Sequence, residues 1–454
     1  MRRARFQLLP ELALVVLGAL LRFTFLDNHG DASRNFDFLD HKLYLEWFEK
    51  NWALPPLSLS RSSYGPPLYY FLGGLGLRLG GGMALVHWAS VAMGVLRLSL
   101  FAWALKWALP DDRLARCYAL AVAAVLPAAV HLDGMTNNES LSLLLCWSLL
   151  ASWRWVHEAE GRKRWEAGGI AGVLLGAALL TKYSAIILAP SMAGIALCSW
   201  VFGRAQPMQV RLQQSGPWIL AIVLATLLSG GYFARNYAEH GRLFPTAFEG
   251  NDRVAMTEEI RTTPIWNRRE TGFFLGWSKD IYQVPHYPSG TTPESHFFPT
   301  LLASTFSAYY LVNFSRQQVR ADPATNARLP EPTLSLARMS VIGGTWLALT
   351  LVLGLLVLLM RAYRSGNALE LAYLVTPVLA VFGQAYFSLQ YPIDTYGVTK
   401  GGYLQFAAPC MFAVSGLVTS WTWRRPAWRP LAVFQFIALG YVAVYTIYSR
   451  LTAV

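Results

Sequence analysis

The chain has 454 residues, of which 54% are hydrophobic and only 14% are charged, and its formal net charge is +12. A soluble domain carries about 25% charged residues, so this composition excludes an ordinary water-soluble globular protein. The mean hydropathy of +0.34 indicates a membrane protein instead. Its basic residues are spread over separate short segments, which disfavours nucleic acid as a partner.

Hydrophobic stretches of about 20 residues, the length that crosses about 30 Å of hydrocarbon, recur along the chain. Segments that cross lipid must satisfy their backbone internally, so we predict an all-α polytopic membrane protein with about eleven transmembrane helices. The predicted spans lie near 8–27, 83–107, 113–132, 138–157, 167–182, 184–203, 216–235, 339–360, 368–389, 402–423 and 430–449.

These spans divide the chain into three parts. The first, 1–235, is a transmembrane core that includes a long outer loop over 28–82. A large outer loop over 236–338 follows, and the C-terminal helices occupy 339–454. The short loops on the other side are all basic, so the positive-inside rule places that side and the N-terminus in the cytoplasm.

The first outer loop carries the most informative residues of the chain. Asp37, Asp40 and His41 stand shortly after the first span, and acidic residues at the mouth of a membrane bundle usually mark chemistry or ion handling. A helix is predicted over 41–52. It places Leu43, Trp47 and Phe48 on one face, so we expect it to lie in the membrane plane.

An aromatic segment follows, Tyr64-Gly-Pro-Pro-Leu-Tyr-Tyr70, and we expect its rings to lie along the membrane interface. The segment 66–79 is apolar but too short to span easily, and its glycines weaken it as a helix. The candidate substrate-lining residues of the loop are Tyr44, Tyr64, Pro67, Tyr69 and Tyr70.

Further motifs follow one another along the chain on the predicted outer face. They are an Asn-Glu turn at 138–139, a Thr-Lys at 181–182, an Arg-Asn at 235–236 and a Lys-Gly-x-Tyr at 400–403. Together with the first loop, this order resembles the GT-C glycosyltransferases. The resemblance is to the branch related to protein O-mannosyltransferases and the lipid A aminoarabinose transferases, and it runs from Asp37 to about Tyr403.

The resemblance implies a GT-C-like helical bundle and a membrane enzyme of the cell envelope. Such enzymes transfer a hexosyl or pentosyl group from a polyprenyl phosphate to a glycan, lipid or protein acceptor, with inversion. It further implies the bacterial inner membrane, with an active site that faces the periplasm. Neither the sugar nor the acceptor can be deduced from the sequence.

The family places its catalytic carboxylate in the first outer loop, and two aspartates compete for that position. Asp37 with His41 fits an Asp-x-x-x-His pattern, and Asp40 with Tyr44 fits an Asp-x-x-x-Tyr pattern. A positioned carboxylate can take the proton of the attacking acceptor hydroxyl. We expect Asp37 to be this base and Asp40 to cap the helix over 41–52, where aspartate is favoured.

The turn before the fourth span holds Asp133, Asn138 and Glu139. The resemblance implies that an acidic residue here orients the acceptor or helps to hold a divalent cation, for which oxygen ligands would suit Mg²⁺ or Mn²⁺. The alternative for Glu139 is a carboxylate favoured by the dipole at the start of a helix.

A lipid phosphate requires cations, and the candidates are Lys182, Arg235 and Lys400, with Tyr403 beside them. The alternative for Lys182 is a terminal lysine that reaches the headgroups. The alternative for Lys400 is an ion pair with Asp394. The chain also departs from the family here, because relatives usually carry Arg before the late Tyr where this chain has Gly402.

Two other classes of function fit a polytopic chain with intramembrane charge. A lipid or solute transporter would show broken helices near the midplane and symmetry between halves, and the sequence shows neither clearly. No nucleotide-binding G-x-x-x-x-G-K segment occurs, which disfavours an ATP-driven pump. A scaffold that only binds lipid is the third possibility, and it predicts that loss of Asp37 has no effect.

Overall fold

The computed structural model describes residues 9–28, 37–202, 205–247, 257–278, 280–282, 296–307, 331–392 and 399–451. Within these ranges the regular structure is helical, as the hydropathy pattern predicts. The α-helices are α2 (Leu9–Asn28), α3 (Phe38–Lys50), α4 (Leu68–Arg78), α5 (Gly82–Ala108), α6 (Arg113–Val125), α7 (Pro127–Asp133), α8 (Glu139–Glu158), α9 (Gly161–Leu179), α10 (Leu188–Phe202), α11 (Met208–His240), α13 (Glu258–Thr262), α14 (Thr271–Leu275), α15 (Phe297–Phe306), α16 (Thr333–Ser365), α17 (Ala368–Gln390), α18 (Ala408–Arg424) and α19 (Arg429–Leu451). Three 3-10 segments matter for the site, namely η3 (Arg61–Tyr64), η4 (Tyr183–Ile187) and η8 (Gly401–Ala407).

Seven segments in the described part of the chain are long and apolar enough to cross a membrane. They correspond to the predicted spans near 83–107, 184–203, 216–235, 339–360, 368–389, 402–423 and 430–449. An eighth is obtained if α6 and α7 count as one broken span, with a bend of 57° between them. Pro127 begins α7 and has no backbone N–H to continue the ladder of α6, which accounts for the break.

Of about eleven predicted spans, seven or eight are confirmed as candidate membrane-crossing segments within the described part of the chain. The other three predicted spans, near 8–27, 138–157 and 167–182, do form the helices α2, α8 and α9. Helix α8 is rich in serine, and α9 begins with Gly-Arg-Lys-Arg, which lowers the apolar character of both.

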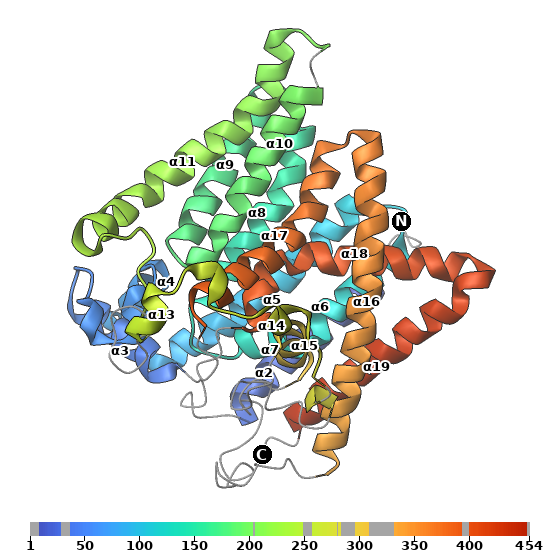
Figure 1. Ribbon diagram of the computed structural model, residues 1–454, viewed down its shortest axis with the longest axis horizontal. Helices are drawn as coiled ribbons and strands as arrows, with labels where there is room; N and C mark the ends of the chain where they lie inside the picture. The colour runs from blue at the N-terminus through green and yellow to red at the C-terminus, as the bar shows by residue number, and fades with distance from the viewer. Residues whose placement is uncertain are drawn as a thin grey trace.

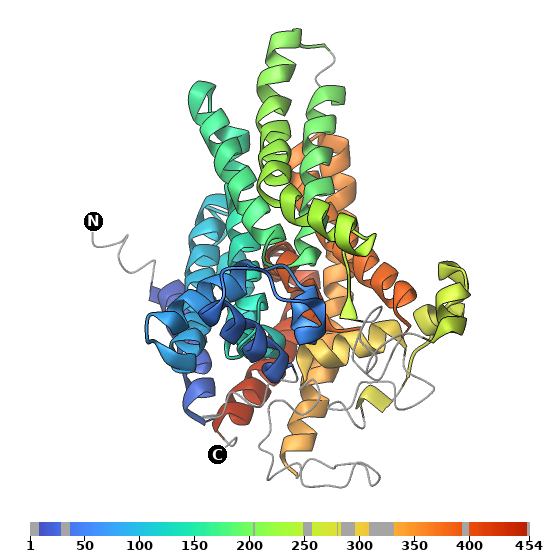
Figure 2. The ribbon, with the colours of Figure 1, turned by 90° about the vertical axis from the view of Figure 1, so that its left-hand side faces the viewer.

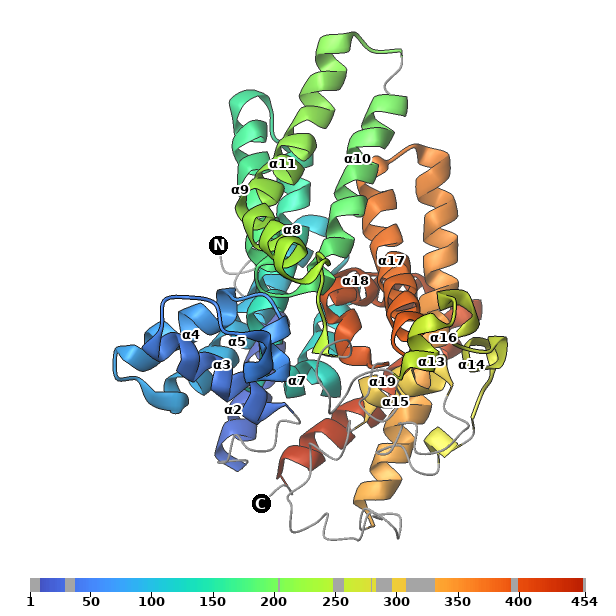
Figure 3. The same cartoon turned by 60° about the vertical axis from the view of Figure 1, so that its left-hand side comes forward.

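The long helices form one bundle in which neighbours along the chain pack side by side (Figure 1). Helix α9 lies against both α8 and α11, and α16 lies against α19. A core of buried aliphatic and aromatic side chains, including Trp153 and Trp218, joins helices from the two halves of the chain. The turns α8–α9, α10–α11 and α16–α17 lie at one end of the bundle, whereas α3, α4 and α13 to α15 lie nearer the opposite end (Figure 3).

Helices α3 and α4 form a compact unit beside α5, below the level of the long green helices in Figure 2. A Cβ at position 74 would lie 2.9 Å from the backbone oxygen of Leu45, so glycine there lets the two helices approach closely. The glycines that weaken α4 as a helix thus allow its tight packing on α3. The pair presents η3 and the start of α3 toward the ends of α8 and α9.

Candidate active site

Arg61 joins the two aspartates of the first loop. Its backbone N–H and Nε donate to the two carboxylate oxygens of Asp40 at 2.9 and 2.8 Å, and its Nη2 lies 2.7 Å from Asp40 Oδ2. The same Nη2 lies 3.0 Å from Asp37 Oδ1. The Asp40 side chain is 18% exposed and that of Asp37 is 35% exposed. Arg61 was not expected at the site, since only the fold places it opposite α3.

Two expectations for the helix over 41–52 are wrong. The helix begins at Phe38, so Asp37 takes the N-cap position and Asp40 lies in the first turn. Asp40 does not cap the helix, because Arg61 engages both of its oxygens. The buried face is also different from the one expected.

His41, Tyr44, Leu45 and Phe48 are buried, at the i, i+3, i+4, i+7 spacing of a helix face. Leu43 is exposed instead. This face packs against α4, so the aromatic residues of Tyr64-Gly-Pro-Pro-Leu-Tyr-Tyr70 do not spread over an interface. Tyr44, Tyr64, Tyr69 and Tyr70 are all buried, and Pro67 is half-buried at the start of α4.

His41 lies behind the aspartates, on the buried face of α3. Its Nδ1 is 2.8 Å from the Tyr70 hydroxyl and 3.2 Å from Ser62 Oγ, so two hydroxyl groups hold the ring in place. Burial lowers the pKa of His41 below its ordinary value and outweighs the opposite effect of nearby Asp37. The lowered pKa favours the neutral form of the imidazole at this position.

A second cluster of charged residues lies at the N-terminus of α8. Lys182, in the turn between α9 and η4, forms an ion pair with Glu139 in the first turn of α8. The Lys182 ammonium also lies 4.8 Å from the centre of the Tyr403 ring, and the Lys400 ammonium lies 5.2 Å from that same ring. Three of the residues predicted to bind a phosphate are therefore adjacent, although Lys400 and Tyr403 follow Lys182 by more than 200 residues.

The two clusters form one electrostatic unit. The pKa of His41 responds to the charges of Asp37, Glu139, Lys182 and Asp40, which come from the first loop, from α8 and from the turn after α9. The carboxylates of the first loop are thus brought to the cations of the later motifs at the same end of the bundle.

Arg235 lies at the edge of this unit. Its Nε donates to Glu239 Oε1 at 2.8 Å, one turn along α11, and the side chain is 38% exposed. Burial raises the pKa of the Tyr44 hydroxyl well above its ordinary value, and the charge of Arg235 acts against this rise. The charge of Arg235 therefore acts on a residue of the first loop, but the Arg235 side chain is more exposed than that of Lys182. Asp394, the alternative partner of Lys400, lies outside the described residues.

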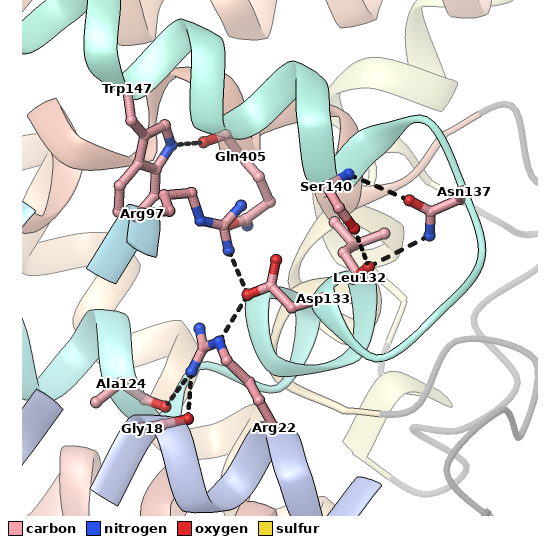
Figure 4. A network of polar contacts seen from close by, with 10 residues as sticks. All are labelled: Gly18, Arg22, Arg97, Ala124, Leu132, Asp133, Asn137, Ser140, Trp147 and Gln405. Atoms are coloured by element: carbon pink, nitrogen blue, oxygen red, sulfur yellow. Dashed lines mark hydrogen bonds and ion pairs between the residues drawn. The ribbon is translucent and has the colours of Figure 1, made fainter. Parts of the chain in front are cut away.

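Asp133 lies in a different environment from the one expected. Its carboxylate is fully buried, and Oδ2 accepts hydrogen bonds from Arg22 Nε and Arg97 Nη2, each at 2.7 Å (Figure 4). Gly94 makes room for it, because a Cβ at that position would lie 2.6 Å from Asp133 Oδ2. Arg22 and Arg97 lie inside predicted spans, where a charged side chain needs a partner, and Asp133 is that partner. This geometry fits a structural role, so Asp133 is left out of the proposed site.

The neighbouring turn is fixed by its own side chains. Asn137 Oδ1 accepts from the backbone N–H groups of Glu139 and Ser140 at 2.9 and 3.3 Å (Figure 4 shows the second contact). Asn138 Nδ2 donates to the carbonyl of Thr181 at 3.1 Å. Asn138 therefore joins the start of α8 to the residue before Lys182, which is a positioning contact.

The expected cation site for Mg²⁺ or Mn²⁺ does not fit the donors present. In the part of the chain that the structure describes, no group of three or more His, Cys, Asp or Glu side chains is arranged to hold a metal ion. The carboxylates of Asp133 and Glu139 face Arg and Lys partners instead. We derive no step through a metal.

The model of the dolichyl-phosphate-mannose-protein mannosyltransferase family matches residues 64–230. This match covers less than half of the chain. The segment contains Glu139 and Lys182, and the resemblance inferred from the sequence is confirmed there. Asp37, Arg235 and Lys400 lie outside the family match. No curated protein sequence matches the chain.

Solved structures show the fold. The oligosaccharyltransferase of Archaeoglobus fulgidus, tethered with an acceptor peptide, aligns over 98% of this chain with a TM-score of 0.52 and 13% identity. The same enzyme in complex with Zn and sulfate aligns over 97% with a TM-score of 0.53 and 14% identity. The chain covers 55% and 53% of those two chains, so it spans about half the length of the archaeal enzyme.

A third structure is that of ArnT from Cupriavidus metallidurans bound to undecaprenyl phosphate. It aligns over 97% of this chain and 75% of its own, with a TM-score of 0.49 and 15% identity. The chain is a multi-pass helical membrane protein, and its fold is similar to that of the archaeal oligosaccharyltransferase.

Proposed function

We propose that this protein is a membrane glycosyltransferase that takes its sugar from a polyprenyl-phosphate-linked donor. The observation that carries the proposal is the meeting of the Asp37 loop with the Lys182–Tyr403–Lys400 cluster around His41. The family match over 64–230 supports a lipid-phosphate sugar donor, because the family is described by that chemistry. The fold alone would carry no function.

In the proposed reaction Asp37 is the general base. It accepts the proton of an acceptor hydroxyl while the oxygen forms a bond to the anomeric carbon, and the bond from that carbon to the phosphate oxygen breaks with inversion. Lys182 and Lys400 stabilise the charge of the departing polyprenyl phosphate, and Arg235 contributes from the edge. Arg61 holds Asp40 and keeps the loop in place. We propose that this site faces the periplasm of a bacterial inner membrane.

Purified protein should transfer sugar from a polyprenyl-phosphate donor and not from a nucleotide sugar. The measurement is product formation in detergent with each donor class in turn, using extracts of cell envelope as the acceptor source. Turnover of a nucleotide sugar in the absence of lipid would contradict the proposal.

Lys400→Ala should weaken binding of a polyprenyl phosphate about tenfold or more, because a charge-assisted contact is worth roughly 1.5–3 kcal/mol. Binding can be followed by titration of the lipid into detergent-solubilised protein. A matched control is Arg425→Ala, which also removes a cation stacked on an aromatic ring, 4.4 Å from the centre of Trp421. Equal loss in both variants would show that Lys400 acts through packing and not through the phosphate.

A further inference from the structure

The proposed reaction uses Lys182 but gives no role to Glu139, the carboxylate that forms an ion pair with it. The two side chains are 19% and 14% exposed, so the pair is largely shielded from water. A phosphate that binds Lys182 must compete with a carboxylate already in contact with the same ammonium group. An acid in this position lowers the affinity of the site that it lines.

The pair is not needed to hold the two turns together. The start of α8 is fixed by Asn137, which accepts from the backbone of Glu139 and Ser140. Asn138 donates to the carbonyl of Thr181, next to Lys182. Since Asn138 already joins these turns, the charge of Glu139 is available for another purpose.

The charges around the site are balanced as the structure stands. Asp37, Asp40 and Glu139 supply three carboxylates, and Arg61, Lys182 and Lys400 supply three cations. The first two carboxylates are paired with Arg61, which leaves Glu139 as the acid, within the described part of the chain, that faces the lysines. A phosphate arriving at the lysines therefore meets this one carboxylate as its direct competitor.

The donor and product lipids differ in charge, and this difference explains why competition between Glu139 and phosphate for Lys182 would be useful. A polyprenyl-phosphate sugar is a phosphodiester with one negative charge, whereas the product is a phosphomonoester with a charge of about −1.5 to −2 at pH 7. The product would therefore bind two lysines more tightly than the donor does. Product release limits the rate in many enzymes.

We infer that Glu139 sets the affinity of this site for phosphate by competing for Lys182, and that it promotes release of the polyprenyl monophosphate. The inference rests on the proposed function, since it concerns the same phosphate site. Glu139 yields Lys182 when phosphate binds and takes it back when the lipid leaves. By linkage, the contact of Lys182 with Glu139 weakens phosphate binding, and bound phosphate weakens the contact of Lys182 with Glu139 to the same extent.

The test is the affinity of the full-length protein for polyprenyl monophosphate, measured by titration in detergent. Glu139→Gln keeps the size of the side chain and an oxygen that can accept from Lys182, but removes the charge. We expect it to bind the lipid about tenfold more tightly, within the roughly 5–150-fold range typical of coupled sites. Glu166→Gln is the matched control, because Glu166 also pairs with a basic residue, Arg162, on an exposed turn, and it should leave the affinity unchanged.

Lys182→Met and the double variant complete the design. Lys182→Met should weaken binding, and Glu139→Gln combined with Lys182→Met should lose the gain, because both residues act on the same contact. A double variant that keeps the gain would overturn the inference. The same titration with inorganic phosphate separates the phosphate group from the rest of the lipid. If Glu139→Gln raises the affinity for inorganic phosphate as much as for the lipid, the effect belongs to the phosphate group alone. If it raises only the affinity for the lipid, the effect requires the phosphate to be held together with its polyprenyl chain.

The outcomes separate this inference from the proposed function. If Lys182→Met weakens binding but Glu139→Gln does not strengthen it, the phosphate site stands and the role of Glu139 is refuted. If Lys182→Met has no effect on binding, both proposals fail. Should Glu139→Gln unfold, Glu139→Asp withdraws the carboxylate by one methylene and should give a smaller gain, and an affinity at or below that of the wild type would overturn the inference.

Discussion

Asp37→Asn is expected to lower turnover by about 10²–10⁴-fold while leaving the affinity for polyprenyl phosphate largely unchanged. The amide has the size of the carboxylate but cannot take a proton from the acceptor. The geometry favours Asp37 over Asp40 as the base, because Arg61 engages both oxygens of Asp40 but contacts Asp37 through Oδ1, and Asp37 is more exposed. The measurement is the rate of transfer at saturating donor.

Asp40→Asn serves as the matched variant in this experiment. It should weaken the contact to Arg61 and reduce the rate less than Asp37→Asn does. A dead Asp40→Asn together with an active Asp37→Asn would assign the base to Asp40. Full activity in both would remove the first loop from the chemistry and favour a transporter or a lipid-binding scaffold.

Asp133→Ala should destabilise the fold by about 3–5 kcal/mol, the cost of leaving a buried charge without its partner. Arg22 and Arg97 are each 1% exposed, and both donate to the same carboxylate oxygen. Removal of Asp133 leaves two guanidinium groups inside the bundle with no counter-charge. Thermal unfolding in detergent measures the loss.

Glu166→Gln is again the control, because its pair with Arg162 is exposed and should be worth less than about 1 kcal/mol. A stable Asp133→Ala that has lost activity would show that Asp133 contacts substrate after all. It would return Asp133 to the acceptor or metal role that the family resemblance implies.

Much of the bundle could be predicted from hydropathy, because a helix that crosses lipid needs an unbroken apolar stretch. The failures have local causes. Helix α8 interrupts its apolar residues with serines, and the buried face of α3 differs from the predicted one because α4 packs against it. Packing against a neighbouring helix overrides an amphipathic pattern read from one segment alone.

The site could be predicted in part. Short motifs in the outer loops and at the ends of spans predict Asp37, Glu139, Lys182 and Lys400 as site residues, and these roles stay predictions. The sequence could not predict which cation meets which acid, because these contacts join residues far apart in the chain. Arg61 lies in a loop without a distinctive motif, and the pairing of Arg22 with Asp133 spans 111 positions. Only the fold brings these groups together.

The most direct test of the central claim is a density map of the protein with a polyprenyl monophosphate bound, obtained with the Glu139→Gln variant to raise occupancy. We predict that the phosphate lies against Lys182 and Lys400 beside the Tyr403 ring, within reach of the loop that carries Asp37. A phosphate at the opposite end of the bundle, for example in the cleft lined by His157 and Arg164, would contradict it.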